Sequence, residues 1–332
     1  MSWLITGGAG FIGSHLAGVL LGRGEHVAIL DDCSTGALDN LAHLRGDRLS
    51  VHVGDVGDAD LVERLTPAGG TIVHLAAAVG VRRILDHQVA GIRTNILGTE
   101  AVLTAAERRK ARVFLASTSE VYGRRRDAPF AEDDDCLIGP SSVHRWSYAA
   151  SKLVDEFLAL AWWRERGVPV TIARYFNVCG PRQSARYGMV LPNFCRAALD
   201  GKPLEVHGDG AQSRCFLHVD DAVRATLALI EQPRAIGQVT NIGSTEEVTI
   251  AELARRVVER AGSSSPVAMV PYSHAFPDGG FADMPRRVPD LARLRGLTGW
   301  KAQRDLAGII DDTIAQIRGV RVSDRLAAAA GG

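Results

Sequence analysis

The residues best suited to do chemistry are a tyrosine and a lysine four positions apart, Tyr148 and Lys152. Apolar residues recur around them with helical spacing, and positions i and i+4 of a helix lie on one face. A phenol has an ordinary pKa of about 10, and an ammonium fixed beside it favours the phenolate. The pair could therefore act as a general base near neutral pH. The alternative is an ordinary tyrosine and lysine on a solvated helix face.

A glycine-rich segment near the N-terminus could hold a phosphate group. Residues 3–5 predict a short strand, residues 6–13 read Thr-Gly-Gly-Ala-Gly-Phe-Ile-Gly, and residues 14–22 predict an amphipathic helix. Glycines permit a tight turn and close backbone approach, and the N–H groups at a helix N-terminus can bind a pyrophosphate. The spacing Gly-x-x-Gly-x-x-Gly differs from Gly-x-Gly-x-x-Gly, the commonest dinucleotide fingerprint.

An acidic residue follows the second predicted strand, residues 26–30, at Asp31 and again at Asp32. A carboxylate at this place accepts hydrogen bonds from the adenosine ribose and repels a 2′-phosphate, so NAD is favoured over NADP. The alternative role, a carboxylate that begins a surface turn, suits Asp32 better than Asp31. Strand, glycine loop, helix, strand and acid together predict a dinucleotide site.

Further strands and helices alternate along the first half of the chain, which predicts an α/β fold with a doubly wound parallel sheet. Ligands bind at the carboxyl ends of such strands. Those ends carry Asp55, the alanines of residues 76–78, and residues 117–120. Asp55 could meet the adenine amine, and the alanines would let the cofactor lie flat. Tight packing is the alternative role for the alanines.

Composition limits the classes of partner. The chain has 332 residues, and its 38 basic and 38 acidic residues cancel, so no overall charge favours a nucleic acid or an anionic membrane. The five cysteines lie far apart, without the close pairs typical of zinc sites, and predict neither a disulfide framework nor a metal site. No uncharged run of about 18 residues is present. We expect a soluble cytoplasmic protein.

As a set, these motifs resemble those of an extended short-chain dehydrogenase/reductase of the nucleotide-sugar epimerase, dehydratase and decarboxylase group. The resemblance extends from residue 2 to about residue 318. It implies a Rossmann-type NAD-binding domain at residues 1–175, with a return segment at about 215–240. A smaller mixed α/β substrate domain would comprise residues 176–214 and 241–320, followed by a disordered tail at 321–332. Family members often form homodimers through a four-helix bundle that includes the helix carrying Tyr148.

The resemblance also implies roles for individual residues. Tyr148 would be the catalytic base, Lys152 would bind the nicotinamide ribose and lower the pKa of Tyr148, and Thr118 would hydrogen-bond the sugar hydroxyl that is oxidised. The other cofactor-binding residues would be Gly7, Gly10, Phe11, Ile12, Gly13, Asp31, Asp55, Val56, Ala76 and Asn95. The substrate-binding residues would be Asn177, Val190 and Asn193 at the nucleotide and Arg214 and Arg287 at the diphosphate.

Glu120 helps to distinguish the possible reactions. Every member of the group first oxidises the sugar at C4, and the members differ in the step that follows. On an extended segment, Glu120 would lie on the same side as Thr118 and could exchange a proton or order a water near C5. The string Thr-Ser-Glu-Val-Tyr-Gly at 118–123 resembles that of UDP-glucuronate decarboxylases, also called UDP-xylose synthases. Residues 141–147 differ from the decarboxylase pattern. A strand-end carboxylate bonded to backbone amides is the structural alternative for Glu120.

The sequence therefore predicts an NAD-dependent UDP-glucuronate decarboxylase that acts through a 4-keto intermediate and yields UDP-xylose. A UDP-sugar 4-epimerase acting on UDP-glucose or UDP-glucuronate is the alternative, followed by a nucleotide-sugar 4,6-dehydratase. Ser119, where dehydratases typically carry aspartate, argues against the last of these. A non-catalytic NAD-binding sensor is a further class, but such proteins usually lack the tyrosine or the lysine.

Overall fold

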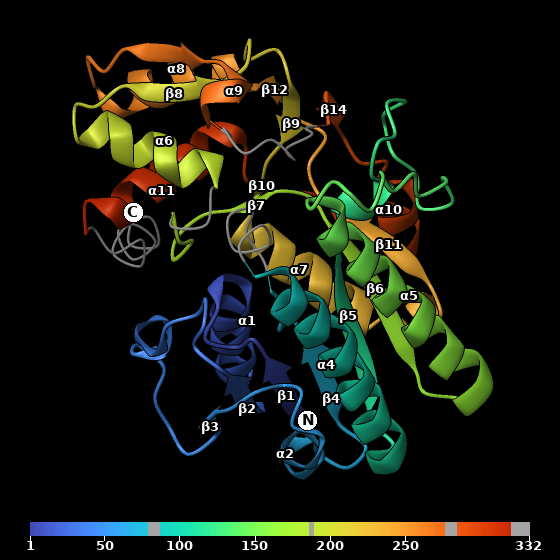
Figure 1. Ribbon diagram of the computed structural model, residues 1–332. Coiled ribbons are helices and arrows are strands. Elements are labelled where there is room, and N and C mark those ends of the chain that lie inside the picture. The colour runs from blue at the N-terminus through green and yellow to red at the C-terminus, as the bar shows by residue number, and fades with distance from the viewer. Residues whose placement is uncertain (79–86, 186–188, 276–283, 320–332) are drawn as a thin grey trace.

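A seven-stranded parallel sheet forms the larger part of the molecule (Figure 1). The computed structural model describes residues 1–78, 87–185, 189–275 and 284–319. The strand order is β3-β2-β1-β4-β5-β6-β11, and every neighbouring pair is parallel. The strands are β1 (Ser2–Thr6), β2 (His26–Asp31), β3 (Leu49–Val53), β4 (Thr71–His74), β5 (Arg112–Thr118), β6 (Val170–Tyr175) and β11 (Val239–Ile242). This confirms the predicted doubly wound α/β sheet.

The direction of strand order reverses between β1 and β4, which creates the crevice where such sheets bind ligands. Successive side chains of β1 pack into different apolar cores on the two faces of the sheet, because side chains alternate across a strand. Ile5 belongs to the core beneath α1 (Phe11–Gly22) and α7 (Val219–Ile230). Leu4 belongs to the opposite core, with α4 (Gln88–Arg109) and α5 (Trp146–Arg166). A short helix, α2 (Ala59–Leu65), packs on α4.

A smaller part of mixed topology has its own apolar core. Its helices α6, α8 and α11 lie together at the top left of Figure 1, away from the large sheet. They are α6 (Val190–Leu199), α8 (Ile250–Ala261) and α11 (Leu306–Ile317). Its short strands are β7 (Val178–Cys179), β8 (Leu204–His207), β9 (Ser213–Cys215), β10 (Leu217–His218), β12 (Glu247–Thr249), β13 (Val267–Val270) and β14 (Arg286–Arg287).

The chain passes repeatedly between these two parts. After β10 it forms α7, which packs on α1, and then β11, which pairs with β6. The later helix α10 (Ala292–Thr298) packs on α7 and β11, whereas α11 packs on α6 and α8. The remaining short elements are η1 (Leu38–Leu41), η2 (Ser119–Tyr122), η3 (Pro233–Ala235) and α9 (Tyr272–Ala275).

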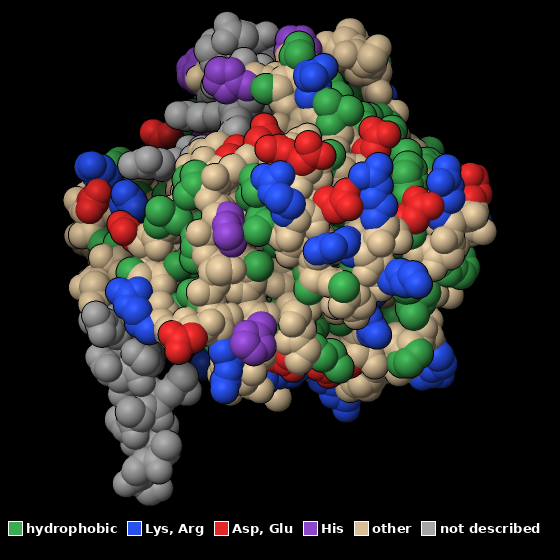
Figure 2. All heavy atoms as spheres, turned by 90° about the horizontal axis from the view of Figure 1, so that it is seen from below, with side chains coloured by type: hydrophobic (Ala, Val, Ile, Leu, Met, Phe, Trp, Pro, Cys, Tyr) green, Lys and Arg blue, Asp and Glu red, His purple; other side chains and the backbone are tan. Residues whose placement is uncertain are grey.

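The surface carries charges of both signs. Basic and acidic side chains are interspersed on the face drawn in Figure 2. None of the helices in the described ranges combines the length and apolar character that a membrane crossing requires. The predicted disordered tail at 321–332 lies outside the described residues.

A buried ion pair connects α5 to β6. The Arg174 guanidinium donates to both oxygens of Glu156, with Nη2–Oε2 at 2.8 Å and Nε–Oε1 at 3.0 Å. The Ser117 hydroxyl donates to the same carboxylate. Since the two charged side chains are only 5% and 4% exposed, each depends on the other for its counter-charge. The pair fixes the helix that carries Tyr148 against the sheet.

We expect Arg174→Met to lower the free energy of unfolding by about 3–5 kcal/mol, because Glu156 would stay buried without its cation. Urea denaturation measures the loss. Arg260→Met is the matched control, since Arg260 pairs with Asp311 at the surface and should cost less than about 1 kcal/mol. Equal losses in the two variants would contradict this account of the buried pair.

Candidate active site

Tyr148 and Lys152 lie on the first two turns of α5, close to the carboxyl end of β5. The Thr118 hydroxyl, at the end of β5, lies near enough to the Tyr148 phenol to lower its pKa. The Lys152 ammonium is buried at 2% exposure and donates to Asp155 Oδ2 at 2.8 Å. The structure thus brings together the base, the hydroxyl and the lysine that the sequence singled out.

The electrostatic setting of Tyr148 differs from the prediction. Burial raises the pKa of Tyr148, and the Glu120 carboxylate raises it further, while the nearby Thr118 hydroxyl lowers it. Lys152 was expected to lower that pKa, but its charge is directed at Asp155 instead. Asp155 itself adds to the rise in the pKa of Tyr148. A cation brought into the site would favour the phenolate.

Glu120 lies at this site on a backbone conformation that differs from the extended segment predicted. The strand ends at Thr118, whose Oγ1 accepts a hydrogen bond from the Glu120 N–H at 3.2 Å, and a 3-10 turn follows. The argument from an extended segment therefore does not apply. Arginine side chains, rather than backbone amides, satisfy the carboxylate: Arg145 Nη2 lies 3.1 Å from Oε2, and Arg287 Nη1 donates to Oε1.

The two arginines keep Glu120 ionised. Burial alone would raise the pKa of Glu120, but Arg145 and Arg287 lower it to about 2. Glu120 is therefore a carboxylate throughout the neutral range, and its negative charge faces Tyr148. Arg145 lies three residues before Tyr148, in the segment 141–147 that the sequence analysis counted as a departure from the decarboxylase pattern.

Arg287, which was predicted to clamp the diphosphate, has two side-chain partners at this site. Besides its bond to Glu120, it donates through Nη2 to Asn177 Oδ1 at 3.0 Å. Arg214 is its register partner on the neighbouring strand β9 and donates to the Ser213 and Met284 carbonyl oxygens. Asn177 also donates to the Cys215 carbonyl at 2.9 Å. These three predicted substrate residues thus lie together beside the catalytic end.

The other two predicted substrate residues lie on the first turn of α6. Val190 packs against the core of the smaller part, and Asn193 is exposed. The preceding residues, 186–188, lie outside the described ranges.

The glycine loop has the shape that a pyrophosphate requires. Gly7 has φ +72°, and a Cβ placed there would lie 2.7 Å from the Ala76 nitrogen. A Cβ on Gly13 would lie 2.4 Å from the Gly7 carbonyl oxygen. Gly10 is the N-cap of α1, and no side chain of the described residues caps that helix there. The N–H groups of the first turn, which includes Phe11 and Ile12, can therefore receive phosphate oxygens.

Asp31 both ends β2 and holds the glycine loop. Its carboxylate accepts from the Ala9 N–H at 2.9 Å and from the Cys33 N–H at 2.8 Å. Burial raises the pKa of Asp31, and these two donors oppose the rise. Just after the carboxyl end of β3, Asp55 is exposed and Val56 is buried against Gly98 of α4.

Asn95 connects the loop after β4 to the helix that carries Tyr148. It accepts from the Ala78 N–H and donates to Ser151 Oγ, both at 2.9 Å. Ser151 in turn donates to the Tyr148 carbonyl at 2.9 Å. These residues border a small hollow, lined by Ala78, Gln88, Gly91, Ile92, Asn95, Ser147, Tyr148 and Ser151.

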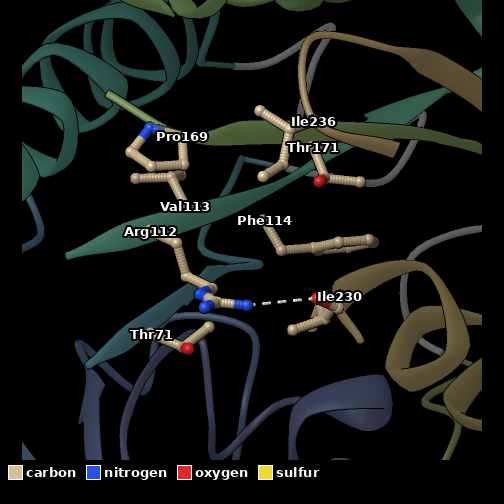
Figure 3. Close-up of a pocket in the computed structure, with 8 residues that line it drawn as sticks. All are labelled: Thr71, Arg112, Val113, Phe114, Pro169, Thr171, Ile230 and Ile236. Atoms are coloured by element: carbon tan, nitrogen blue, oxygen red, sulfur yellow. Dashed lines mark hydrogen bonds between the residues drawn. The ribbon is translucent and has the colours of Figure 1, made fainter. Parts of the chain in front are cut away.

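A second hollow lies at the opposite, amino ends of β4, β5 and β6 (Figure 3). Its only marked polar contact in that view joins Arg112 Nη1 to the Ile230 carbonyl at 3.4 Å. Its lining includes no carboxylate or histidine that could activate the hydroxyls of Thr71 and Thr171. Within the described ranges, no group of three or more histidine, cysteine or acidic side chains is placed to hold a metal ion.

Sequence reasoning missed two charged residues of this site, Arg145 and Asp155. Asp155 follows Lys152 by three positions, a spacing that places both on one face of a helix, so the signal was present. Arg145 had no comparable signal, because its partner Glu120 is distant in sequence and meets it only in the fold.

We expect Gly13→Ala to weaken NAD binding at least about tenfold, because the new methyl group would collide with loop backbone. Quenching of tryptophan fluorescence measures the affinity. Gly22→Ala, on the same helix with open space around it, is the control and should bind NAD as the unaltered chain does. Undiminished binding by Gly13→Ala would refute the assignment of the loop.

Comparison with known proteins agrees with this geometry. The model of the NAD dependent epimerase/dehydratase family matches residues 3–243. A UDP-N-acetyl-alpha-D-glucosaminuronate decarboxylase of Bacillus cytotoxicus is 43% identical over 88% of this chain and 90% of its own length. UDP-glucuronic acid decarboxylase 1 of Xenopus tropicalis is 33% identical, over 95% of this chain and 72% of its own.

One solved structure of similar fold contains both UDP-glucuronic acid and NAD. It is a UDP-glucuronic acid 4-epimerase from Bacillus cereus, in complex with UDP-glucuronic acid and NAD. Its TM-score is 0.84 at 28% identity, over 96% of this chain and 99% of that one. The site geometry and these similarities together show that the chain belongs to the NAD-dependent epimerase/dehydratase family, the extended short-chain dehydrogenases/reductases.

Proposed function

We propose that this chain decarboxylates UDP-glucuronate to UDP-xylose, with NAD as its cofactor. The observation that carries the proposal is the pair of Glu120 and Arg287 beside Tyr148. A uronate brings a carboxylate of its own, and a planar guanidinium suits it. Arg287 is held in place there by Glu120 and Asn177. The decarboxylase relatives support this choice.

The residues can perform the reaction in a defined order. Tyr148 removes the proton of the sugar 4-hydroxyl, which Thr118 orients. The glycine loop and Lys152 would hold NAD, whose chemistry when bound would be to accept the hydride of C4 and later return it. The resulting C4 ketone is β to the carboxylate, so the C5–C6 bond breaks, carbon dioxide leaves, and its electron pair passes to the C4 oxygen. A proton then adds to C5, and Tyr148 returns its proton to the 4-hydroxyl as C4 is reduced.

Glu120 has a limited role in this series of reaction steps. Because the arginines hold it as a carboxylate, it has no proton of its own to give to C5. It can accept a hydrogen bond from a water near C5 and orient that water. Its charge also keeps Tyr148 protonated until a cation enters the site.

The sugar has a second candidate. The Bacillus cytotoxicus relative, at 43% identity, is named for the N-acetylglucosamine form of the uronate. The same C4 oxidation and carboxylate loss would apply to that substrate, because the two sugars differ only at C2. The two candidates therefore share one mechanism and differ in substrate.

We expect the purified protein with NAD to release carbon dioxide from UDP-glucuronate and to form a UDP-pentose, both followed by NMR. UDP-N-acetylglucosaminuronate is tested in parallel, and faster release from it would reassign the sugar. Tyr148→Phe should reduce the rate at least about 100-fold while NAD binding is retained. Formation of UDP-galacturonate without carbon dioxide would show a 4-epimerase and refute the proposal.

We also propose that two copies associate through α4 and α5. Exposed apolar side chains gather on these adjacent helices: Val89, Ile92, Leu97, Val154 and Phe157. Soluble surfaces seldom show such a group without a partner. Trp162 and Trp163 do not belong to it, because both pack against the core of their own chain.

Phe157→Glu should convert the dimer to a monomer, because a charge would enter the centre of the apolar interface. Size-exclusion chromatography with light scattering measures the mass. Leu137→Glu alters a similarly exposed apolar residue outside both helices and should leave the mass unchanged. A monomeric unaltered protein would contradict the proposed dimer.

The larger part is the proposed NAD-binding domain, and the smaller part is the proposed nucleotide-sugar domain. Their boundaries at residues 175, 214 and 240 stay predictions, as does the cytoplasmic location. The proposal for the sugar domain is supported by Asn177, Arg214 and Arg287, which lie beside the catalytic end.

A further inference from the structure

A series of buried polar side chains connects Lys152 to the strand that precedes the glycine loop. Asp155 accepts from Lys152 and interacts with the Thr99 hydroxyl. Thr99 Oγ1 lies 3.2 Å from His74 Nε2, and His74 Nδ1 lies 2.7 Å from Thr6 Oγ1. All five side chains are at most 2% exposed. We call them the internal polar chain; it crosses from α5 through α4 and β4 to β1.

The donors and acceptors of this chain admit one consistent arrangement. Asp155, paired with an ammonium, can only accept, so the nearby Thr99 hydroxyl directs its single proton toward it. Thr99 must then accept from Nε2–H of His74. The other nitrogen, Nδ1, therefore accepts from the Thr6 hydroxyl. The Ala76 N–H, 3.4 Å from Thr6 Oγ1, completes the series. The imidazole and the Thr6 hydroxyl are satisfied when the imidazole is neutral, whereas Asp155 Oδ1 has no hydrogen-bond partner among the described residues.

The state of His74 agrees with that arrangement. Burial lowers the pKa of His74 to about 3, and the nearby charge of Lys152 acts in the same direction. The histidine is therefore a fixed neutral connector at neutral pH. Its position between Thr6 and Thr99 links the start of the cofactor loop to the carboxylate that pairs with Lys152.

Other charged groups near Lys152 have different partners. Glu156, on the same helix, is bound by Arg174 and Ser117. Glu120, which faces Tyr148, is bound by Arg145 and Arg287. Asp155 is thus the acid in contact with the ammonium, and a buried ammonium requires such a counter-charge.

We propose that Asp155 is a positioning residue for cofactor binding. It takes one of the three N–H donors of Lys152, fixes the ammonium in place, and leaves the other two for the cofactor ribose. Thr99 and His74 hold Asp155 in turn. The inference rests on the proposed role of Lys152 toward NAD, and it does not depend on which sugar is converted.

The test is the affinity for NAD, measured by tryptophan fluorescence between about pH 6 and pH 10 without any sugar. Asp155→Asn keeps the shape and removes the charge. We expect NAD binding to weaken at least about tenfold.

Variants of Thr99 test the rest of the chain and keep the ion pair. Thr99→Val removes the donor to Asp155 and should weaken NAD binding about threefold or more, while Thr99→Ser should restore it. If Asp155→Asn fails to fold, the two Thr99 variants still test whether the internal polar chain affects NAD binding. Glu107→Gln is the matched control, because Glu107 of α4 pairs with Arg166 of α5 at the exposed surface.

Unchanged NAD affinity in Asp155→Asn and Thr99→Val at every pH would overturn the inference, as would an equal effect in Glu107→Gln. Failure of the proposed function has a different signature. In that case the unaltered protein binds NAD but releases no carbon dioxide from any uronate, and the NAD titrations still test Asp155.

Discussion

Helix α5 depends on the pairing of charges that the fold removes from water. Lys152 pairs with Asp155, and Glu156 pairs with Arg174 of the sheet. Arg145, at the start of the helix, pairs with Glu120. An unpaired buried charge would be strongly destabilising, so each pair restricts where the helix can lie. Tyr148 lies between Arg145 and Lys152 on this helix, and its position follows from those restrictions.

The same charges also control reactivity. Glu120 keeps a full negative charge because two arginines outweigh the cost of its burial. That charge raises the pKa of Tyr148, so the phenol remains protonated until positive charge enters. The tyrosine–lysine spacing alone therefore does not set the pKa of the phenol, since the charge of Glu120 also acts on it.

The glycine loop supplies a second constraint, which is steric. Gly7 approaches the backbone after β4, and Gly13 approaches Gly7 itself, so neither position has room for a side chain. Asp31 then fixes the loop from the neighbouring strand by accepting the Ala9 N–H. Because β1 lies between β2 and β4, all three contacts meet where the strand order reverses. The crevice for the dinucleotide follows from strand order and glycine spacing together.

The sequence by itself determined the sheet, the family and the presence of Thr118, Glu120 and Lys152 near Tyr148, because hydrophobic periodicity and short motifs are local signals. Only the tertiary structure decided how the charges are paired. Glu120 meets Arg145 and Arg287, which lie 25 and 167 positions away. The extended segment assumed for Glu120 is a 3-10 turn. Partners so distant in sequence leave no periodic signal, since the folding of the chain alone brings them into contact.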